Sequence, residues 1–131
     1  MKTDVFFVDA VKVDYDGNFD TYLKKYSKNI QLLFTKVQFL SAYVKKTSHG
    51  YHIYYNVKTR KELPFKTKLL LGLMLGDDTR RSVYSYIEGH NILFDKKKGK
   101  EAVYAEEETK KLNEVLNKGQ DIKIVKVMLK L

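Results

Sequence analysis

Tyrosine, lysine, hydroxyl and histidine side chains occur at every second position along one stretch of this sequence, and together they can bind a ligand. The set comprises Tyr43, Lys45, Thr47, His52, Tyr54, Asn56 and Lys58. Tyrosine rings can stack on the bases of an unpaired nucleic-acid strand, lysines can neutralise its phosphates, and the other side chains can form hydrogen bonds. The alternative is an ordinary solvated sheet face, where tyrosine and threonine reflect β-propensity and lysine provides solubility. We expect this set to bind a single strand.

A predicted hairpin positions this set. The runs on either side of Ser48-His49-Gly50 are β-rich and predict a hairpin over about residues 37–58. We expect a two-residue loop at His49-Gly50, with Gly50 supplying the positive φ of a tight turn. In that register Lys45 lies opposite Tyr54, and strict alternation separates the binding set from an apolar face. This apolar face, the predicted core, comprises Leu40, Ala42, Val44, Ile53, Tyr55 and Val57.

Further basic residues lie outside the hairpin, in a loop, at the start of a helix and in a basic tip. They are Arg60, Lys61, Arg80, Arg81, Lys96, Lys97, Lys98 and Lys100. Such clusters are often only solvated surface, and the two helix arginines can instead pair locally with Asp77 or Asp78. We expect them to extend the binding set into a continuous basic surface.

Composition favours a polyanionic partner. The 131 residues carry 25 Lys+Arg against 16 Asp+Glu, a formal net charge of +9, and such a balance attracts nucleic acids through steering and counterion release. The absence of cysteine excludes disulfide scaffolds, thiolate zinc sites and cysteine nucleophiles. The first residues resemble neither a signal peptide nor a membrane span, so we expect an intracellular protein without membrane contact.

The other elements predict a single α+β domain over residues 1–131, with an antiparallel sheet packed against short helices. Strands are expected over residues 4–15, 91–94 and 122–131, and helices over about 19–29, 64–75, 79–87 and 106–118. The helix at 64–75 is leucine-rich nearly all round, which predicts that it is buried in the centre of the fold.

Catalytic chemistry has less support. Asp9, Asp14 and Asp16 could together hold magnesium, but Asp16 fits a turn and Asp14 a strand edge, and we favour these structural roles. The histidines lack the spacing of a metal site. We therefore expect a non-enzymatic protein with no metal and no cofactor.

Three segments carry a resemblance to a known family. Residues 47–53, 75–80 and 92–96, which read TSHGYHI, LGDDTR and ILFDK, look like those of small archaeal virus and plasmid proteins related to the archaeo-eukaryotic primases. The resemblance implies that His52 contacts a nucleotide and that Asp14 and Asp16 correspond to an acid pair that binds a metal. A primase-like, magnesium-dependent nucleotidyltransferase, active or degenerate, is the alternative function.

The whole chain is also similar in size, charge and these segments to the single-stranded-DNA-binding proteins of archaeal rod-shaped viruses, the rudiviruses. This resemblance implies binding of single-stranded DNA without sequence preference, during viral genome replication or recombination in the host cytoplasm. It also implies a homodimer that works beside a viral annealing ATPase and a nuclease. A third hypothesis is a basic adaptor protein that meets a partner through an exposed strand edge, such as the predicted C-terminal strand.

Overall fold

The structure, a computed structural model, describes residues 6–33, 37–89, 96–97 and 100–129. In chain order its elements are β1 (Phe7–Asp16), α1 (Phe19–Leu33), β2 (Gln38–Lys46), β3 (Gly50–Thr59), α2 (Phe65–Met74), α3 (Thr79–Glu88), β4 (Lys96–Lys97), β5 (Lys100–Glu101), β6 (Val103–Tyr104) and α4 (Glu106–Leu129).

The main sheet has four strands in the order β1-β3-β2-β6, and every pairing in it is antiparallel. β1 and β2 therefore run parallel, with β3 inserted between them and α1 connecting them, a split β-α-β arrangement. β4 and β5 form a separate two-stranded ladder that leads into β6. The expected α+β class and the antiparallel sheet around a central hairpin are confirmed.

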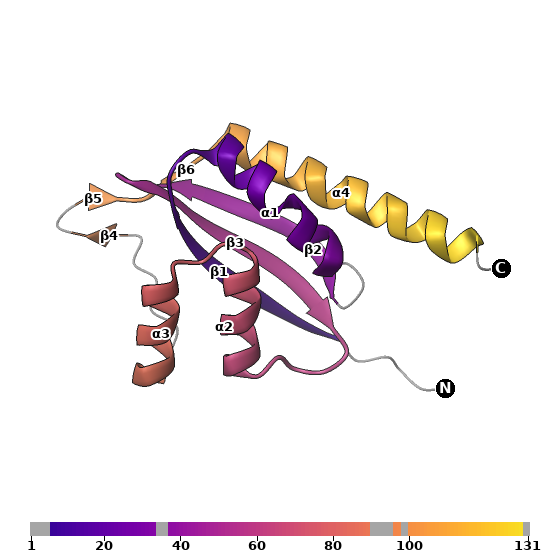
Figure 1. The fold of residues 1–131 in the computed structure, drawn as a ribbon, viewed down its shortest axis with the longest axis horizontal. Helices are drawn as coiled ribbons and strands as arrows, with labels where there is room; N and C mark the ends of the chain where they lie inside the picture. Colours follow the sequence, from indigo (N-terminus) through magenta and orange to yellow (C-terminus); the bar gives the residue numbers. More distant parts are fainter. Residues whose placement is uncertain (1–5, 34–36, 90–95, 98–99, 130–131) are drawn as a thin grey trace.

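α1 and α4 lie along one side of the sheet, and α2 and α3 lie toward its β1 side (Figure 1). Side chains from α1 and α4 pack against alternate residues of the three long strands and form the core. Its fully buried members are Val11, Val13, Tyr22, Ile30, Phe39, Val44, Ile53, Tyr55, Val57, Leu75, Leu112 and Leu116. Alternation then sends the intervening strand residues to the opposite face of the sheet.

The hairpin forms in a register that differs from the predicted one by two residues. Lys45 lies opposite His52, and Tyr43 lies opposite Tyr54. The turn begins one residue earlier than expected, because the backbone N–H of Thr47 donates to the Gly50 oxygen at 2.8 Å. A shift of two residues preserves the sorting of side chains between faces, whereas a shift of one would have inverted it.

The expected reason for Gly50 is wrong. Positive φ values occur at Gly17, Gly76 and Gly89, and Gly50 is not among them. A Cβ at Gly50 would instead lie 2.0 Å from the backbone oxygen of Tyr15 on the neighbouring strand. The glycine is therefore required by the close approach of β1, with which Gly50 pairs at Asp16.

A β-bulge overturns one core assignment. The β2–β3 register shifts between Phe39 and Ser41, which leaves Leu40 as the extra residue. The Leu40 side chain is 45% exposed, and Phe39 is fully buried in its place. A bulge displaces alternation by one position, so the strict pattern predicted for Leu40 fails at this end of β2.

Two predicted elements are corrected. The leucine-rich helix α2 is not buried all round, since Leu69 is buried but Leu70 is 63% exposed. The expected C-terminal strand at 122–131 is also wrong, because α4 continues as helix through Gly119 to Leu129. The strand expected at 91–94 lies outside the described residues.

Side chains occupy hydrogen-bonding positions along both outer edges of the long strands. On β1, Asp77 Oδ1 accepts from the Asp14 N–H at 2.7 Å, and the Asp78 N–H donates to the Asp14 oxygen at 2.9 Å. On β2, the Asn113 amide accepts from the Ala42 N–H at 2.8 Å and donates to its oxygen at 2.9 Å. These contacts occupy the edges where a partner strand would pair.

None of the helices that the structure describes has the length and apolar character needed to cross a membrane.

Candidate nucleic-acid interface

The sheet face opposite α1 and α4 carries an ordered grid of polar and aromatic side chains, which we call the tyrosine face. Pairing between strands places its residues in rows. The rows are Asp14, His52, Lys45 and Tyr104; then Lys12, Tyr54 and Tyr43; then Ala10, Asn56 and Ser41; and last Val8, Lys58 and Gln38. Four strands thus bring together residues that lie up to 96 positions apart in the chain, as Val8 and Tyr104 do.

Three tyrosines and one lysine form the centre of this face. The rings of Tyr43 and Tyr104 stack with centroids 4.9 Å apart and planes 18° from parallel. Tyr54 lies on the other side of Tyr43, at 6.2 Å between centroids. The Lys45 ammonium lies 5.8 Å from the centroids of both Tyr43 and Tyr54. Tyr43 is 38% exposed and Tyr104 48% exposed, so aromatic surface and positive charge face solvent together.

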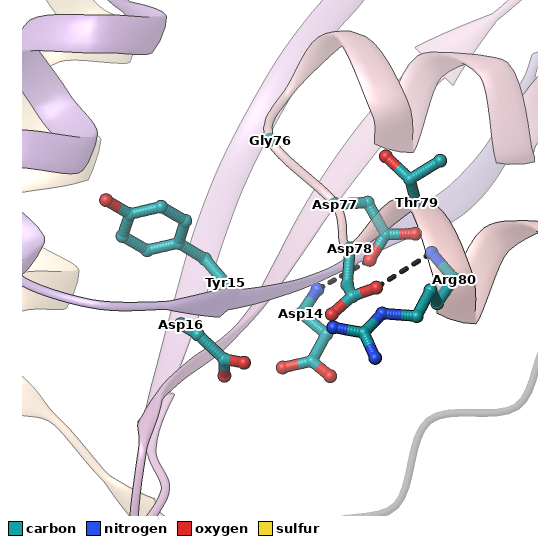
Figure 2. Close-up of a pocket in the computed structure, with 8 residues that line it drawn as sticks. All are labelled: Asp14, Tyr15, Asp16, Gly76, Asp77, Asp78, Thr79 and Arg80. Atoms are coloured by element: carbon teal, nitrogen blue, oxygen red, sulfur yellow. Dashed lines mark hydrogen bonds between the residues drawn. The ribbon is translucent and has the colours of Figure 1, made fainter.

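One end of the tyrosine face is acidic. His52 is buried, and its Nε2 lies 3.7 Å from Asp14 Oδ1. Burial raises the pKa of the Asp14 carboxyl above its usual value, an effect that the nearby His52 opposes and the Asp16 charge reinforces. Figure 2 shows the carboxylates of Asp14 and Asp16 on the same side of β1, beside a hollow of about 340 Å³ that Arg80 also lines.

Two further acids at this hollow already have partners. Asp77 is buried and accepts hydrogen bonds from the backbone of Asp14, from the side chain of Ser82 and from the Arg81 guanidinium, whose Nη2 lies 2.7 Å from Oδ2. Asp78 caps α3 by accepting from the Arg80 and Arg81 N–H groups. These acids position the start of α3 beside β1. Asp9 lies apart from them and contacts Lys68 and the Leu63 N–H.

The structure brings together six of the seven hairpin residues predicted for binding, namely Tyr43, Lys45, His52, Tyr54, Asn56 and Lys58. Thr47 belongs to the turn, where its hydroxyl accepts from the Gly50 N–H at 3.1 Å. His52 is buried beside Asp14, so little of its side chain faces solvent.

The other predicted basic residues divide between the two ends of the sheet. Arg60 and Lys61 are exposed just after β3, at the Lys58 end. Lys96, Lys97 and Lys100 belong to the β4–β5 ladder near the opposite end, while Lys98 lies outside the described residues. Arg80 is exposed at the start of α3, whereas the Arg81 side chain is only 10% exposed and pairs with Asp77. The grid lies between these two basic groups.

Sequence reasoning missed three residues of this surface. Lys12 lies between the buried Val11 and Val13, and alternation in the first strand would have placed it on the tyrosine face. Tyr104 belongs to a strand of only two residues, too short to leave a periodic signal. Phe6 precedes β1, and the centroid of its ring lies 4.0 Å from the Lys58 ammonium.

Within the described ranges, no group of three or more histidine, cysteine, aspartate or glutamate side chains is arranged to hold a metal ion.

Comparisons of this chain with protein-family models, with curated proteins and with solved structures find no match.

Proposed function

We propose that this protein binds single-stranded nucleic acid, with single-stranded DNA as the natural ligand, without sequence preference. The observation that carries the proposal is the tyrosine face, where Tyr43, Tyr54 and Tyr104 gather around the Lys45 ammonium. Every base has a π-face, so stacking on tyrosine tolerates any sequence, and a lysine between the rings can meet the adjoining phosphate. Sheet faces with exposed aromatic rings are a known platform for unpaired bases.

The charge distribution supports the same ligand. Lys12, Lys45 and Lys58 mark three rows of the grid, and exposed basic residues continue beyond its Lys58 end. An unpaired strand is flexible enough to follow this curved surface, whereas a duplex hides its bases inside its stack.

A double substitution of Tyr43 and Tyr54 by alanine tests this proposal. We expect binding to a labelled oligonucleotide to weaken by about 1–3 kcal/mol for each stack removed, with little change in the thermal midpoint because Tyr43 is exposed and Tyr54 partly exposed. Tyr84→Ala is the matched control, since Tyr84 is 64% exposed on α3 and belongs to none of the rows of the grid. Fluorescence anisotropy at two salt concentrations, with single- and double-stranded DNA, measures the effect. Unchanged affinity in the double variant would remove the tyrosine face from the binding site.

A primase-like nucleotidyltransferase is the second candidate, and the Asp14–His52 contact at 3.7 Å beside Asp16 favours it. Carboxylates that converge on a hollow are the ligands that magnesium requires. Extension of a primer from nucleoside triphosphates, dependent on magnesium and lost in Asp14→Asn, would decide for this activity. Binding of single strands without any extension would decide against it.

The biological setting rests on the family resemblance and stays a prediction. It comprises replication or recombination of a viral genome in the host cytoplasm, a homodimer, and work beside an annealing ATPase and a nuclease. The third hypothesis, a basic adaptor that meets a partner through an exposed strand edge, stays a prediction. Its expected edge, the C-terminal strand, is wrong because α4 is helical up to Leu129.

A further inference from the structure

We propose that Phe6 and Lys58 form a second contact point for the same nucleic-acid strand, at the far end of the tyrosine face. Affinity then depends on the length of the bound oligonucleotide. This inference rests on the proposed function and deepens it. It describes a site with two aromatic and cationic centres, the first around Lys45 and the second around Lys58.

The second centre repeats the chemistry of the first. The Lys58 ammonium lies 4.0 Å from the centroid of the Phe6 ring, closer than Lys45 lies to either of its tyrosines. Phe6 is 41% exposed, so its ring is accessible although a charged group lies over part of it. A ring beside an ammonium group can accept a base and its neighbouring phosphate at one position.

The second centre lies on the same face as the first. Lys58 pairs with Val8 on β1, and it is separated from Tyr54 by four residues along β3. At about 3.3 Å per residue, this separation is roughly 13 Å. A nucleic-acid strand that lies along β3 therefore meets the two centres in succession.

The row between the centres contains no aromatic ring. It consists of Ala10, Asn56 and Ser41, and the Asn56 amide donates to the Ser41 hydroxyl at 3.0 Å. The Asn56 and Ser41 side chains are thus already hydrogen-bonded to each other, and Ala10 contributes only a methyl group. A single nucleotide at the first centre cannot use the second, so only a strand long enough to cross this row gains from it.

Charge beyond the second centre favours a polyanion there. Arg60 and Lys61 are exposed just after β3, whereas the other end of the face carries Asp14 and Asp16. Phosphates are therefore attracted to the Lys58 end of the face, beyond the first centre at Lys45.

The test compares two oligothymidines, a dimer, whose single internucleotide step is shorter than the distance between the centres, and one of about twelve nucleotides, a length within the site sizes of single-strand binders. In a Phe6→Ala, Lys58→Gln variant we expect the longer oligonucleotide to bind roughly tenfold more weakly and the dimer to bind as before, because stacking and charge are lost only at the second centre. Tyr43→Ala should weaken both lengths. Lys58→Arg, with Phe6 kept, should bind the longer oligonucleotide as tightly as the unaltered protein does, since arginine keeps the charge and stacks on rings.

Loss of affinity for both lengths in the Phe6→Ala, Lys58→Gln variant, or for neither, would overturn the second contact point while leaving the proposed function standing. If the unaltered protein binds neither oligonucleotide, the proposed function itself fails. Thermal midpoints of all variants confirm that affinities are compared between folded proteins.

Discussion

The two faces of the central sheet are built from alternate residues of the same strands and have opposite properties. On the helix-covered face, Val13 and Ile53 are completely buried beneath α1 and α4. Their sequence neighbours Lys12 and Tyr54 point the other way and are partly exposed. The apolar area removed from water on the covered face stabilises the fold, which leaves the opposite face available for ligand chemistry.

Tyrosine appears on both faces, and its surroundings determine its role. Tyr22 and Tyr55 are fully buried, with their hydroxyl oxygens 2.5 Å apart, and the Tyr22 hydroxyl donates to the Leu75 oxygen at 2.6 Å. Burial raises the pKa of both phenols. Tyr43 and Tyr104, by contrast, meet solvent with exposed rings. A buried hydroxyl needs a partner, while an exposed ring can offer its face to a ligand.

The largest expected effect is on stability and comes from the covered face. Ile53→Ala should destabilise the fold by about 2–5 kcal/mol, because it deletes buried methyl groups and leaves a cavity. Tyr54→Ala, one residue along on the tyrosine face, should cost far less stability and weaken strand binding instead. Urea denaturation and anisotropy, measured on both variants, give the comparison. Equal destabilisation by the two changes would contradict the division between the faces.

Removing one tyrosine hydroxyl from each face tests the same difference between the faces, with a smaller expected change in the free energy of unfolding. Tyr22→Phe should destabilise the protein by about 1–3 kcal/mol, because the Leu75 oxygen loses its donor and the Tyr55 hydroxyl loses its acceptor. Tyr43→Phe is the matched control on the tyrosine face, where the stacking ring is kept. We expect neither stability nor affinity to change in that control, and a loss of affinity there would indicate recognition through the hydroxyl rather than through stacking.

The salt dependence of binding separates two lysines that both lie near tyrosine rings. Lys45→Gln should reduce the slope of log affinity against log salt by about 0.7, the value for one phosphate contact of a single strand. Lys25→Gln is the control, because Lys25 lies 5.5 Å from the Tyr26 ring but belongs to α1 on the covered side. Anisotropy titrations over a series of salt concentrations measure both slopes. A similar reduction in both variants would point to a diffuse electrostatic attraction.

The hairpin and its two faces were predictable because period-two alternation survives small errors in register. The predicted loop was wrong by one residue, yet Tyr43 and Lys45 stayed on one face and Val44 on the other. The helix caps at Asn18 and Asp78 were also predictable, because short polar side chains before a helix satisfy its first N–H groups.

Other features depend on tertiary contacts that leave no local signal. The bulge that exposes Leu40 and the two-residue strand at Tyr104 are set by neighbouring strands. The apolar alternation after Gly119 predicted a strand, but this segment continues α4 as helix. Asp77 illustrates the same limit. Its local pairing with Arg81 was one of the alternatives that the sequence offered, but only the fold shows that Asp77 also accepts from the Asp14 N–H on β1.

The smallest expected effect concerns Asp14 and the pH dependence of stability. Burial raises the pKa of this carboxyl in the folded state, so the folded protein holds the proton more tightly than the unfolded chain. Its contribution to stability is therefore complete below the ordinary value of 3.8 and is lost as the pH rises through the folded-state pKa. Asp14→Asn should consequently stabilise the protein near neutral pH relative to acid pH, as measured by urea denaturation across the range. Asp16→Asn, at an exposed position two residues away, should show no such pH-dependent gain, and a gain of the same size there would locate the effect in general charge repulsion.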